Sequence, residues 1–207
     1  MTGPIDLPPS LQTRSRVVVV TGSRADYGLL RPVMRAIHAH PQLELAVVAA
    51  GSHLVAPAET FYEVKKDFAI AQIVPMQIAG RAGRAEDVES VARGVGRFGR
   101  AFEQLNPDWI VVLGDRIEAF AAAAAGSIGG RAVAHIHGGD RAEGVADEAM
   151  RHAVTKLAHL HFPATPTSAD RIRRMGEPDD CVIVTGSPAL DELDQIPPLD
   201  EAADRAL

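Results

Sequence analysis

The chain of 207 residues is 46% hydrophobic and 23% charged, the composition of an ordinary globular protein with a sizeable core. Its formal net charge of -6 at pH 7 argues against binding to nucleic acid or to anionic membranes, because both need a broad basic face. The single cysteine, Cys181, excludes a disulfide framework and fits a reducing compartment. The first residues do not resemble a signal peptide, and no apolar run reaches the ~20 residues that span a bilayer. We therefore expect a cytoplasmic protein without membrane contact.

The amino-terminal part of the sequence predicts a tail followed by alternating strands and helices. Residues 1–15 are polar and rich in proline, which indicates a loose tail. The β-branched run Val17–Val20 predicts a strand that ends in a glycine-containing loop. A helix is expected from about Leu29 to His38, where apolar residues recur at helical spacing. A second strand is expected at 43–51 and a weaker third strand at 69–76.

The same alternation continues along the rest of the chain. Strands are expected at 108–115, 131–139, 159–165 and 181–187, and helices at 86–105, 116–130, 146–158 and 167–176. Continuously apolar strands that alternate with helices are typical of a parallel sheet covered on both faces. The predicted fold is therefore α/β, a Rossmann-like doubly wound parallel sheet at residues 16–193, followed by an acidic tail at 194–207. Ligands of such sheets bind outside the carboxyl ends of the strands, so candidate site residues are sought there.

The loops after the first two strands offer one arginine and one histidine. The first loop, TGSRADYG, lacks the GxGxxG pattern of a dinucleotide site. Arg24 lies beside a helix N-terminus and suits an anion such as a phosphate or a carboxylate, although a capped loop with a surface arginine explains it equally well. His53 in AGSHL reaches the same edge, and a lone histidine there is more often structural than functional.

The loop after the fourth strand, in VLGDRIEA, places charged groups at the expected ligand edge. Gly114 allows a sharp exit from the strand, and Asp115 and Arg116 follow where a helix begins. An N-cap role for the aspartate is the plain structural alternative.

The richest stretch runs from Ala134 to Phe162, AHIHGGDRAEGVADEAMRHAVTKLAHLHF. His135 and His137 alternate with one residue between them, which predicts that both point to one side of the strand. The loop and helix that follow supply further candidates for polar chemistry: Asp140, Glu143, Asp147, Arg151 and His152.

Three readings of this stretch remain open. A metal site is one, since His135, His137, Asp140 and His152 are all metal-ligating types, yet the spacing matches neither HExxH nor CxxC and we expect no metal. Acidic residues that complement a helix dipole are a second reading, and they leave the loop unexplained. Acid–base catalysis is the third. His159 and His161 flank a leucine on a predicted strand, which favours packing over catalysis.

Several segments together resemble one protein family. They are VTGSRADYG, AGSHL, VVLGDRIEAFAAAAA, HIHGGDRAEG, DEAMRHAVTKLAHLHF and VTGSPALDEL. Between Arg16 and Leu193 the chain resembles the amino-terminal half of the UDP-N-acetylglucosamine 2-epimerases, in particular their hydrolysing branch. The resemblance implies the glycosyltransferase-B type of fold, with two Rossmann-like domains and an active site in the cleft between them. It also implies that the chain is a homo-oligomer or meets a chain that supplies the carboxyl-terminal domain.

The chemistry that the resemblance implies would explain the titratable residues. UDP leaves C1 while a base removes the C2 proton, which gives 2-acetamidoglucal, and water then adds with inversion at C2 to release N-acetylmannosamine for the synthesis of sialic-acid-type sugars. The base needs a partly buried setting, and the departing diphosphate needs cations or a helix N-terminus. No redox cofactor is required.

The resemblance also assigns roles to individual residues. Asp115 matches the family's catalytic aspartate, Asp147 the first carboxylate of an acidic pair, Arg24 an arginine near the diphosphate and His53 a histidine of the second loop. Many members have glutamate where this chain has His137, so we expect His137 or Glu143 to take over that role. The expected catalytic set is thus Asp115, Asp147, His137 and Glu143, and the expected substrate-binding set is Arg24, His53, Arg116, Asp140, Arg151 and His152.

The alternative is a non-catalytic module that binds sugar nucleotides or assembles with another subunit. The helix expected at 86–105 carries Gly94, Gly96 and Gly99, which lower helix stability by roughly 1 kcal/mol each relative to alanine. Close approach of another helix would compensate, for example across a dimer interface.

Overall fold

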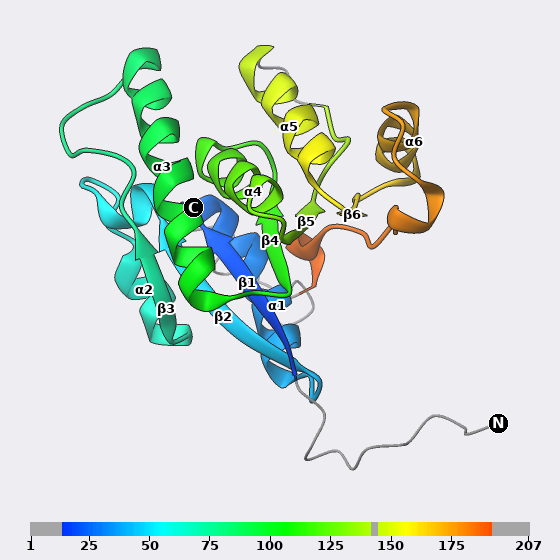
Figure 1. Ribbon diagram of the computed structural model, residues 1–207, viewed down its shortest axis with the longest axis horizontal. Helices are drawn as coiled ribbons and strands as arrows, with labels where there is room; N and C mark the ends of the chain where they lie inside the picture. The colour runs from blue at the N-terminus through cyan, green and yellow to red at the C-terminus, as the bar shows by residue number, and fades with distance from the viewer. Residues whose placement is uncertain (1–13, 142–144, 192–207) are drawn as a thin grey trace, which may run out of the picture.

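The computed structural model describes residues 14–141 and 145–191, with only the helical backbone described for residues 145–147. At its centre is a six-stranded parallel sheet in the order β3-β2-β1-β4-β5-β6 (Figure 1). The strands are β1 (Ser15–Thr21), β2 (Leu43–Ala50), β3 (Ile70–Val74), β4 (Trp109–Leu113), β5 (Ala132–Ile136) and β6 (Leu160–Phe162). The helices are α1 (Arg24–Ala39), α2 (Phe61–Asp67), α3 (Arg84–Leu105), α4 (Ile117–Ile128), α5 (Val145–Leu157) and α6 (Pro166–Arg174). The predicted α/β fold is confirmed, while most of the predicted tail at 1–15 and all of that at 194–207 lie outside the described residues.

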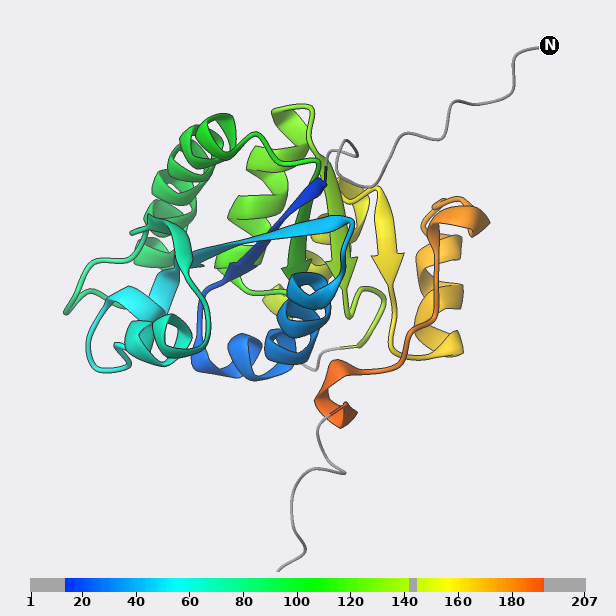
Figure 2. The same cartoon turned by 90° about the horizontal axis from the view of Figure 1, so that it is seen from below.

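Helices cover both faces of the sheet because successive side chains of each strand alternate between the faces. Val18 and Val20 of β1 enter the core that α3, α4 and α5 cover. Val17 and Val19 enter the core beneath α1 and α2 on the other face. Figure 2 shows the two helical layers on either side of the strands, with α6 beyond β6. The continuous valine run is therefore buried on both sides, as a parallel sheet requires.

The alanine-rich helix α4 lies very close to the sheet. The side chains of Ala121, Ala122 and Ala123 are fully buried. A Cβ atom added at Gly126 would lie 2.7 Å from Cδ1 of Ile110 on β4, so a side chain cannot be accommodated there without a shift. The run of small side chains thus lets α4 pack closely on the sheet.

One predicted helix boundary needed correction, and one helix was not predicted. Helix α1 begins at Arg24, five residues before the predicted start, because Ser23 caps it and forms a reciprocal capping box with Asp26. The S-x-x-D spacing in SRAD is the signal for that start. Helix α2, between β2 and β3, had no predicted counterpart.

The strand predicted at 181–187 was wrong. Within the described residues 145–191, this segment joins the sheet through a single bridge between Val182 and His161. The side chains of Ile183 and Val184 are 47% and 43% exposed, so they are not packed into the core of the sheet. The neighbouring strand β6 has three residues, which leaves little backbone for a longer ladder to pair with.

The strand order fixes where a ligand can lie. Strand β1 has β2 on one side and β4 on the other, so the chain reverses its direction of travel across the sheet between β1 and β4. Crevices form outside the carboxyl ends of the strands at such a switch point. The loops after β1, β4 and β5 therefore border the candidate site.

Candidate active site

The loop after β1 is a rigid cap of helix α1 and does not form an open anion-binding site. The carboxylate of Asp26 accepts hydrogen bonds from the backbone N–H groups of Gly22 and Ser23 and from the hydroxyl of Thr21, the last at 2.5 Å. The side chain of Arg24 is 79% exposed and lies 3.6 Å from Glu63. Arg24 is therefore an exposed side chain beside the capped loop, in an ion pair with Glu63, and its contact with an anion stays a prediction.

His53 lies beneath this loop and not in the crevice. Its ring is buried, with Nε2 2.9 Å from the hydroxyl of Thr21 and Nδ1 2.6 Å from that of Thr60. Burial lowers the pKa of His53, so the ring is neutral near pH 7. With both ring nitrogens engaged, His53 supports the loop, and direct contact with a substrate stays a prediction.

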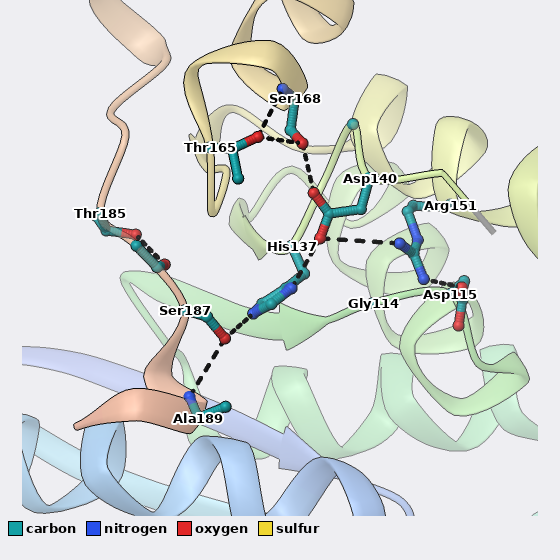
Figure 3. Close-up of polar contacts among 12 residues, drawn as sticks. Gly114, Asp115, His137, Asp140, Arg151, Thr165, Ser168, Thr185, Ser187 and Ala189 are labelled. Carbon is teal, nitrogen blue, oxygen red and sulfur yellow. Dashed lines mark hydrogen bonds and ion pairs between the residues drawn. The ribbon is translucent and has the colours of Figure 1, made fainter. Parts of the chain in front are cut away.

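Asp115 is tied to a helix that lies 36 residues further along the chain. Gly114 has φ +74°, which lets the backbone turn sharply as it leaves β4, and its N–H donates to the carbonyl of Ile136 at 3.0 Å. The guanidinium of Arg151 on α5 donates to Asp115 (Figure 3). The N-cap position of α4 is Arg116, so the alternative of Asp115 as an N-cap is wrong.

A buried carboxyl group lies directly behind Arg116. Glu118 is 1% exposed, and its Oε2 atom lies 3.3 Å from Nε of Arg116. Burial raises the pKa of Glu118 above its ordinary value. Cβ atoms added at Gly22 or Gly51 would lie less than 3 Å from Glu118, so both glycines allow the loops after β1 and β2 to close over it. The arginine is thereby oriented along the crevice edge.

His137 has an unusual backbone and two ring contacts. Its φ of +63° is in the left-handed region that residues other than glycine rarely adopt. Its Nδ1 atom lies 2.9 Å from Oδ2 of Asp140, and its Nε2 atom lies 3.0 Å from the hydroxyl of Ser187 (Figure 3). Asp140 also accepts the hydroxyl of Ser168 at 2.5 Å and lies 4.0 Å from Arg151. Asp115, Arg151, Asp140 and His137 thus form one continuous polar chain.

His135 does not share the surroundings of His137, contrary to the prediction from strand alternation. Strand β5 ends at Ile136, and the left-handed turn at His137 redirects its ring. His135 is fully buried between the carbonyl of Gly114 at 2.8 Å and the hydroxyl of Thr155 at 3.2 Å. Burial lowers the pKa of His135 to about 3, so this ring is a neutral structural group. His161 is also buried, beside Glu177 at 3.2 Å, as expected for packing.

The structure places only some of the remaining predicted site residues. Glu143 and the side chain of Asp147 lie outside the described residues. His152 is half-buried on α5, and its Nε2 atom has no hydrogen-bond partner among the described residues. In residues 14–141 and 145–191, no three histidine, cysteine or acidic side chains are arranged to hold a metal ion. The described helices include none long and apolar enough to cross a membrane.

Two cavities meet at the carboxyl edge of the sheet. One of about 310 Å³ is lined by residues of the β1, β4 and β5 loops and of α5, among them Asp26, Asp115, Arg116, His137 and Arg151. A neighbouring cavity of about 520 Å³ shares Asp115 and Arg116 with it. A more apolar cavity of about 400 Å³ lies between α1 and the strands β4–β6, where Trp109 and Phe162 line it. The charged residues that acid–base chemistry needs are at the first two, so we place the candidate site there.

Comparisons with known proteins show which family the chain matches. A model of the protein family described as UDP-N-acetylglucosamine 2-epimerase matches residues 35–206. The chain belongs to this family. Among UDP-N-acetylglucosamine 2-epimerase relatives, it is 40% identical over 182 residues to the UDP-N,N'-diacetylbacillosamine 2-epimerase (hydrolyzing) of Legionella pneumophila, covering 87% of this chain and 48% of that protein. It is 34% identical over 191 residues to the UDP-N-acetylglucosamine 2-epimerase of Neisseria meningitidis serogroup B, covering 90% and 49%.

Solved structures of the UDP-N-acetylglucosamine 2-epimerases share the fold. A crystal structure of a Listeria monocytogenes protein matches with a TM-score of 0.78 at 22% identity, covering 88% of this chain and 48% of that one. A Neisseria meningitidis structure bound to UDP-GlcNAc matches with a TM-score of 0.77 at 24% identity, covering 86% and 48%. The chain spans about half the length of the curated relatives it matches.

Sequence reasoning assigned no role to two hydroxyl residues, Ser187 and Ser168. The tripeptide TGS occurs twice, at 21–23 and at 185–187, and in both places its serine caps the helical turn that follows. That repetition could have marked Ser187 as a residue that ends a strand-like segment beside the site. Ser168 follows T-P-T at the start of α6, where Thr165 caps the helix.

Proposed function

We propose that the chain is the catalytic-carboxylate half of a hydrolysing 2-epimerase that acts on a UDP-linked 2-acetamido sugar in the cytoplasm. With UDP-N-acetylglucosamine the products would be N-acetylmannosamine and UDP. The observation that carries this proposal is the polar chain from Asp115 through Arg151 and Asp140 to His137, which borders a cavity at the switch point. The family membership supports it.

The reaction needs two proton transfers at C2 of the sugar. In the first stage a base takes the C2 proton, the C–H electron pair forms the C1–C2 double bond, and the C1–O bond breaks with its electrons leaving on UDP. In the second stage the oxygen of water bonds to C1, and a proton returns to C2 from the opposite face. The sugar is neither oxidised nor reduced overall.

The proposed roles follow from position. Asp115 and His137 are the described titratable side chains that line the cavity and belong to the polar chain, so we assign them to proton transfer at C2. Asp147 and Glu143 keep their proposed catalytic roles from the family pattern. The side chain of Arg116 is 44% exposed, whereas that of Arg151 is 14% exposed and is bound to Asp115. Arg116, with Arg24, is therefore the better candidate to neutralise the departing diphosphate. Asp140, Arg151, His152 and, through the loop it supports, His53 complete the proposed substrate site.

The test is a product assay with two substrates. UDP-N-acetylglucosamine and UDP-N,N'-diacetylbacillosamine would be incubated with the chain, alone and with the carboxyl-terminal half of a relative supplied as a second chain. We expect UDP and the free 2-epimerised sugar from at least one of them, as the first stage of sialic-acid-type sugar synthesis. Asp115→Asn should abolish turnover, and Asp170→Asn, in an exposed ion pair with Arg173, should leave it unchanged. Full turnover by Asp115→Asn would refute the catalytic role.

A non-catalytic binding or assembly module is the second candidate. Binding of UDP-sugar with no turnover in any combination of chains would select this candidate over the first.

A further inference from the structure

The ring of His137 is held more firmly than its position after a strand requires. Its backbone is in the left-handed region, which is unfavourable for a residue with a side chain, and both ring nitrogens have partners. The loop behind it is fixed as well. Arg171 on α6 donates to the carbonyl of Gly139 at 2.9 Å, and a Cβ atom at Gly139 would lie 2.2 Å from the carbonyl oxygen of Ser168. Strain that the surroundings maintain in this way is typical of functional positions.

The hydrogen-bond partners of His137 determine which of its two ring nitrogens carries the proton. An ionised carboxylate can only accept, so Nδ1 of His137 must donate its N–H to Asp140. The other oxygen of Asp140 accepts the hydroxyl of Ser168, which leaves no conflict. Nε2 of the neutral ring is then an acceptor, and the hydroxyl of Ser187 donates to it while accepting the N–H of Ala189.

The serine, histidine and aspartate have the connectivity of a nucleophilic triad, but the backbone does not suit acyl transfer. The residue after Ser187 is Pro188, which has no N–H to offer an oxyanion. The next N–H, of Ala189, is already directed at the Ser187 hydroxyl. The hydroxyl therefore serves the ring of His137 rather than a covalent intermediate.

Ser187 reaches the ring because its segment is anchored beside β6. The N–H of Ile183 donates to the carbonyl of His161 at 2.9 Å, and that of Thr185 donates to Pro163 at 3.2 Å. The chain then crosses to α1, where the 3₁₀ turn Pro188–Leu190 packs. Figure 3 shows Ser187 approaching His137 from the side opposite Asp140.

We propose that Asp140 and Ser187 are positioning residues: Asp140 holds His137 in the Nδ1–H tautomer, and Ser187 orients Nε2, the proton-accepting atom of the site. The inference rests on the proposed function only for its effect on turnover, since the tautomer is a property of the chain without substrate. It makes the segment after β6 part of the catalytic machinery: displacement of Ser187 changes the orientation of the base.

The test reads the tautomer directly. Long-range ¹H–¹⁵N spectra of the ¹⁵N-histidine-labelled chain at about pH 8.5, above the ordinary titration range of histidine, separate protonated from unprotonated ring nitrogens. A His137→Gln variant assigns the signal among the eight histidines. We expect one tautomer with the proton on Nδ1 in the wild type and in Ser187→Ala, where Asp140 still accepts the Nδ1 proton, and a mixture of the two tautomers in Asp140→Asn.

Turnover supplies the second readout. Ser187→Ala should lower kcat about tenfold with little change in KM, and Ser187→Thr should restore kcat. Thr185→Ala is the matched control, because its hydroxyl donates to Gly186 and not to the ring. A wild-type proton on Nε2, or an unchanged tautomer in Asp140→Asn, would overturn the inference. An ordered Nδ1–H tautomer in a chain that never turns over would refute the proposed function and leave this inference intact.

Discussion

Arg151 on α5 donates to Asp115 at the end of β4, and so joins two parts of the chain that are 36 residues apart. The contact converts the separate loops after β4 and β5 into one site, because Arg151 also lies 4.0 Å from Asp140. Its guanidinium is 14% exposed, where an ion pair is less screened by solvent than on the open surface. The arginine is therefore the central link of the polar chain.

The first prediction concerns this link. Arg151→Met should lower kcat about 100-fold, because Asp115 loses the group that orients it. Asp115→Asn should lower kcat at least as much, and the double variant should be hardly slower than Asp115→Asn alone. Steady-state kinetics in a double-mutant cycle measure the coupling, with Arg173→Met, in an exposed ion pair, as the control. Fully additive losses would show that the two residues act independently.

A second prediction tests how tightly the loop His137–Asp140 is packed against α6. Gly139→Ala should destabilise the fold by about 3 kcal/mol, since its Cβ atom would overlap the backbone of Ser168 in addition to the positive φ of +74°. Gly130→Ala is a matched control with φ +68° and no described atom within 4 Å of the added Cβ, and it should cost only about 1 kcal/mol. Urea denaturation compares them, and equal losses would show that α6 does not confine the loop.

The glycines of α3 separate into two kinds, which leads to a third prediction. A Cβ atom at Gly94 would lie 3.0 Å from Cβ of Ala121 on α4, whereas one at Gly99 meets no atom of the described chain within 4 Å. Gly99→Ala should therefore stabilise the protein by up to ~1 kcal/mol through helix propensity. Gly94→Ala should stabilise the protein less than Gly99→Ala does, or should destabilise it. Thermal denaturation of both variants checks this, and a larger gain for Gly94→Ala would contradict the tight α3–α4 contact.

Buried histidines make stability depend on pH. Burial lowers the pKa of His53, His135 and His161, that of His135 to about 3. Between the unfolded value near 6.5 and the lower folded values, the unfolded chain binds more protons, so stability is present above pH 6.5 and is lost as pH falls. Each such histidine contributes up to about 1.4 kcal/mol per pH unit. Glu118 acts in the opposite sense, because burial raises its pKa.

Urea denaturation at several pH values between about 7.5 and 5 measures this dependence. We expect the free energy of unfolding to fall across that range in the wild type and to fall less steeply in His135→Gln. The exposed His38→Gln is the control and should keep the wild-type slope. A free energy of unfolding that stays constant down to pH 5 would contradict neutral buried rings.

The sheet was predictable because each of its central strands is a continuous apolar run, and the loops of a parallel sheet must meet at one edge. The convergence of Asp115, His137, Asp140 and Arg151 follows from that rule. The pairs formed within the cluster do not follow from that rule, because the contact of Arg151 with Asp115 depends on the orientation of α5. Strand alternation also failed at His137, where the left-handed backbone ends the strand pattern.

The contrast between His53 and Ser187 shows the same limit. The family resemblance placed His53 in the substrate-binding set, which stays a prediction, and the structure adds that the hydroxyls of Thr21 and Thr60 contact both ring nitrogens. Ser187 was placed on a strand that does not form. The repeated TGS tripeptide marks it as a capping residue but does not indicate that it contacts His137.

The most direct test of the proposed chemistry is the fate of the C2 hydrogen. The chain, together with the carboxyl-terminal half of a relative, would be incubated with UDP-N-acetylglucosamine in heavy water and followed by proton NMR. The account predicts free N-acetylmannosamine that carries deuterium at C2, formed in step with UDP, and no such product from Asp115→Asn. Product that retains its original hydrogen at C2 would contradict the proposed step, in which a base that exchanges its protons with solvent removes the C2 proton.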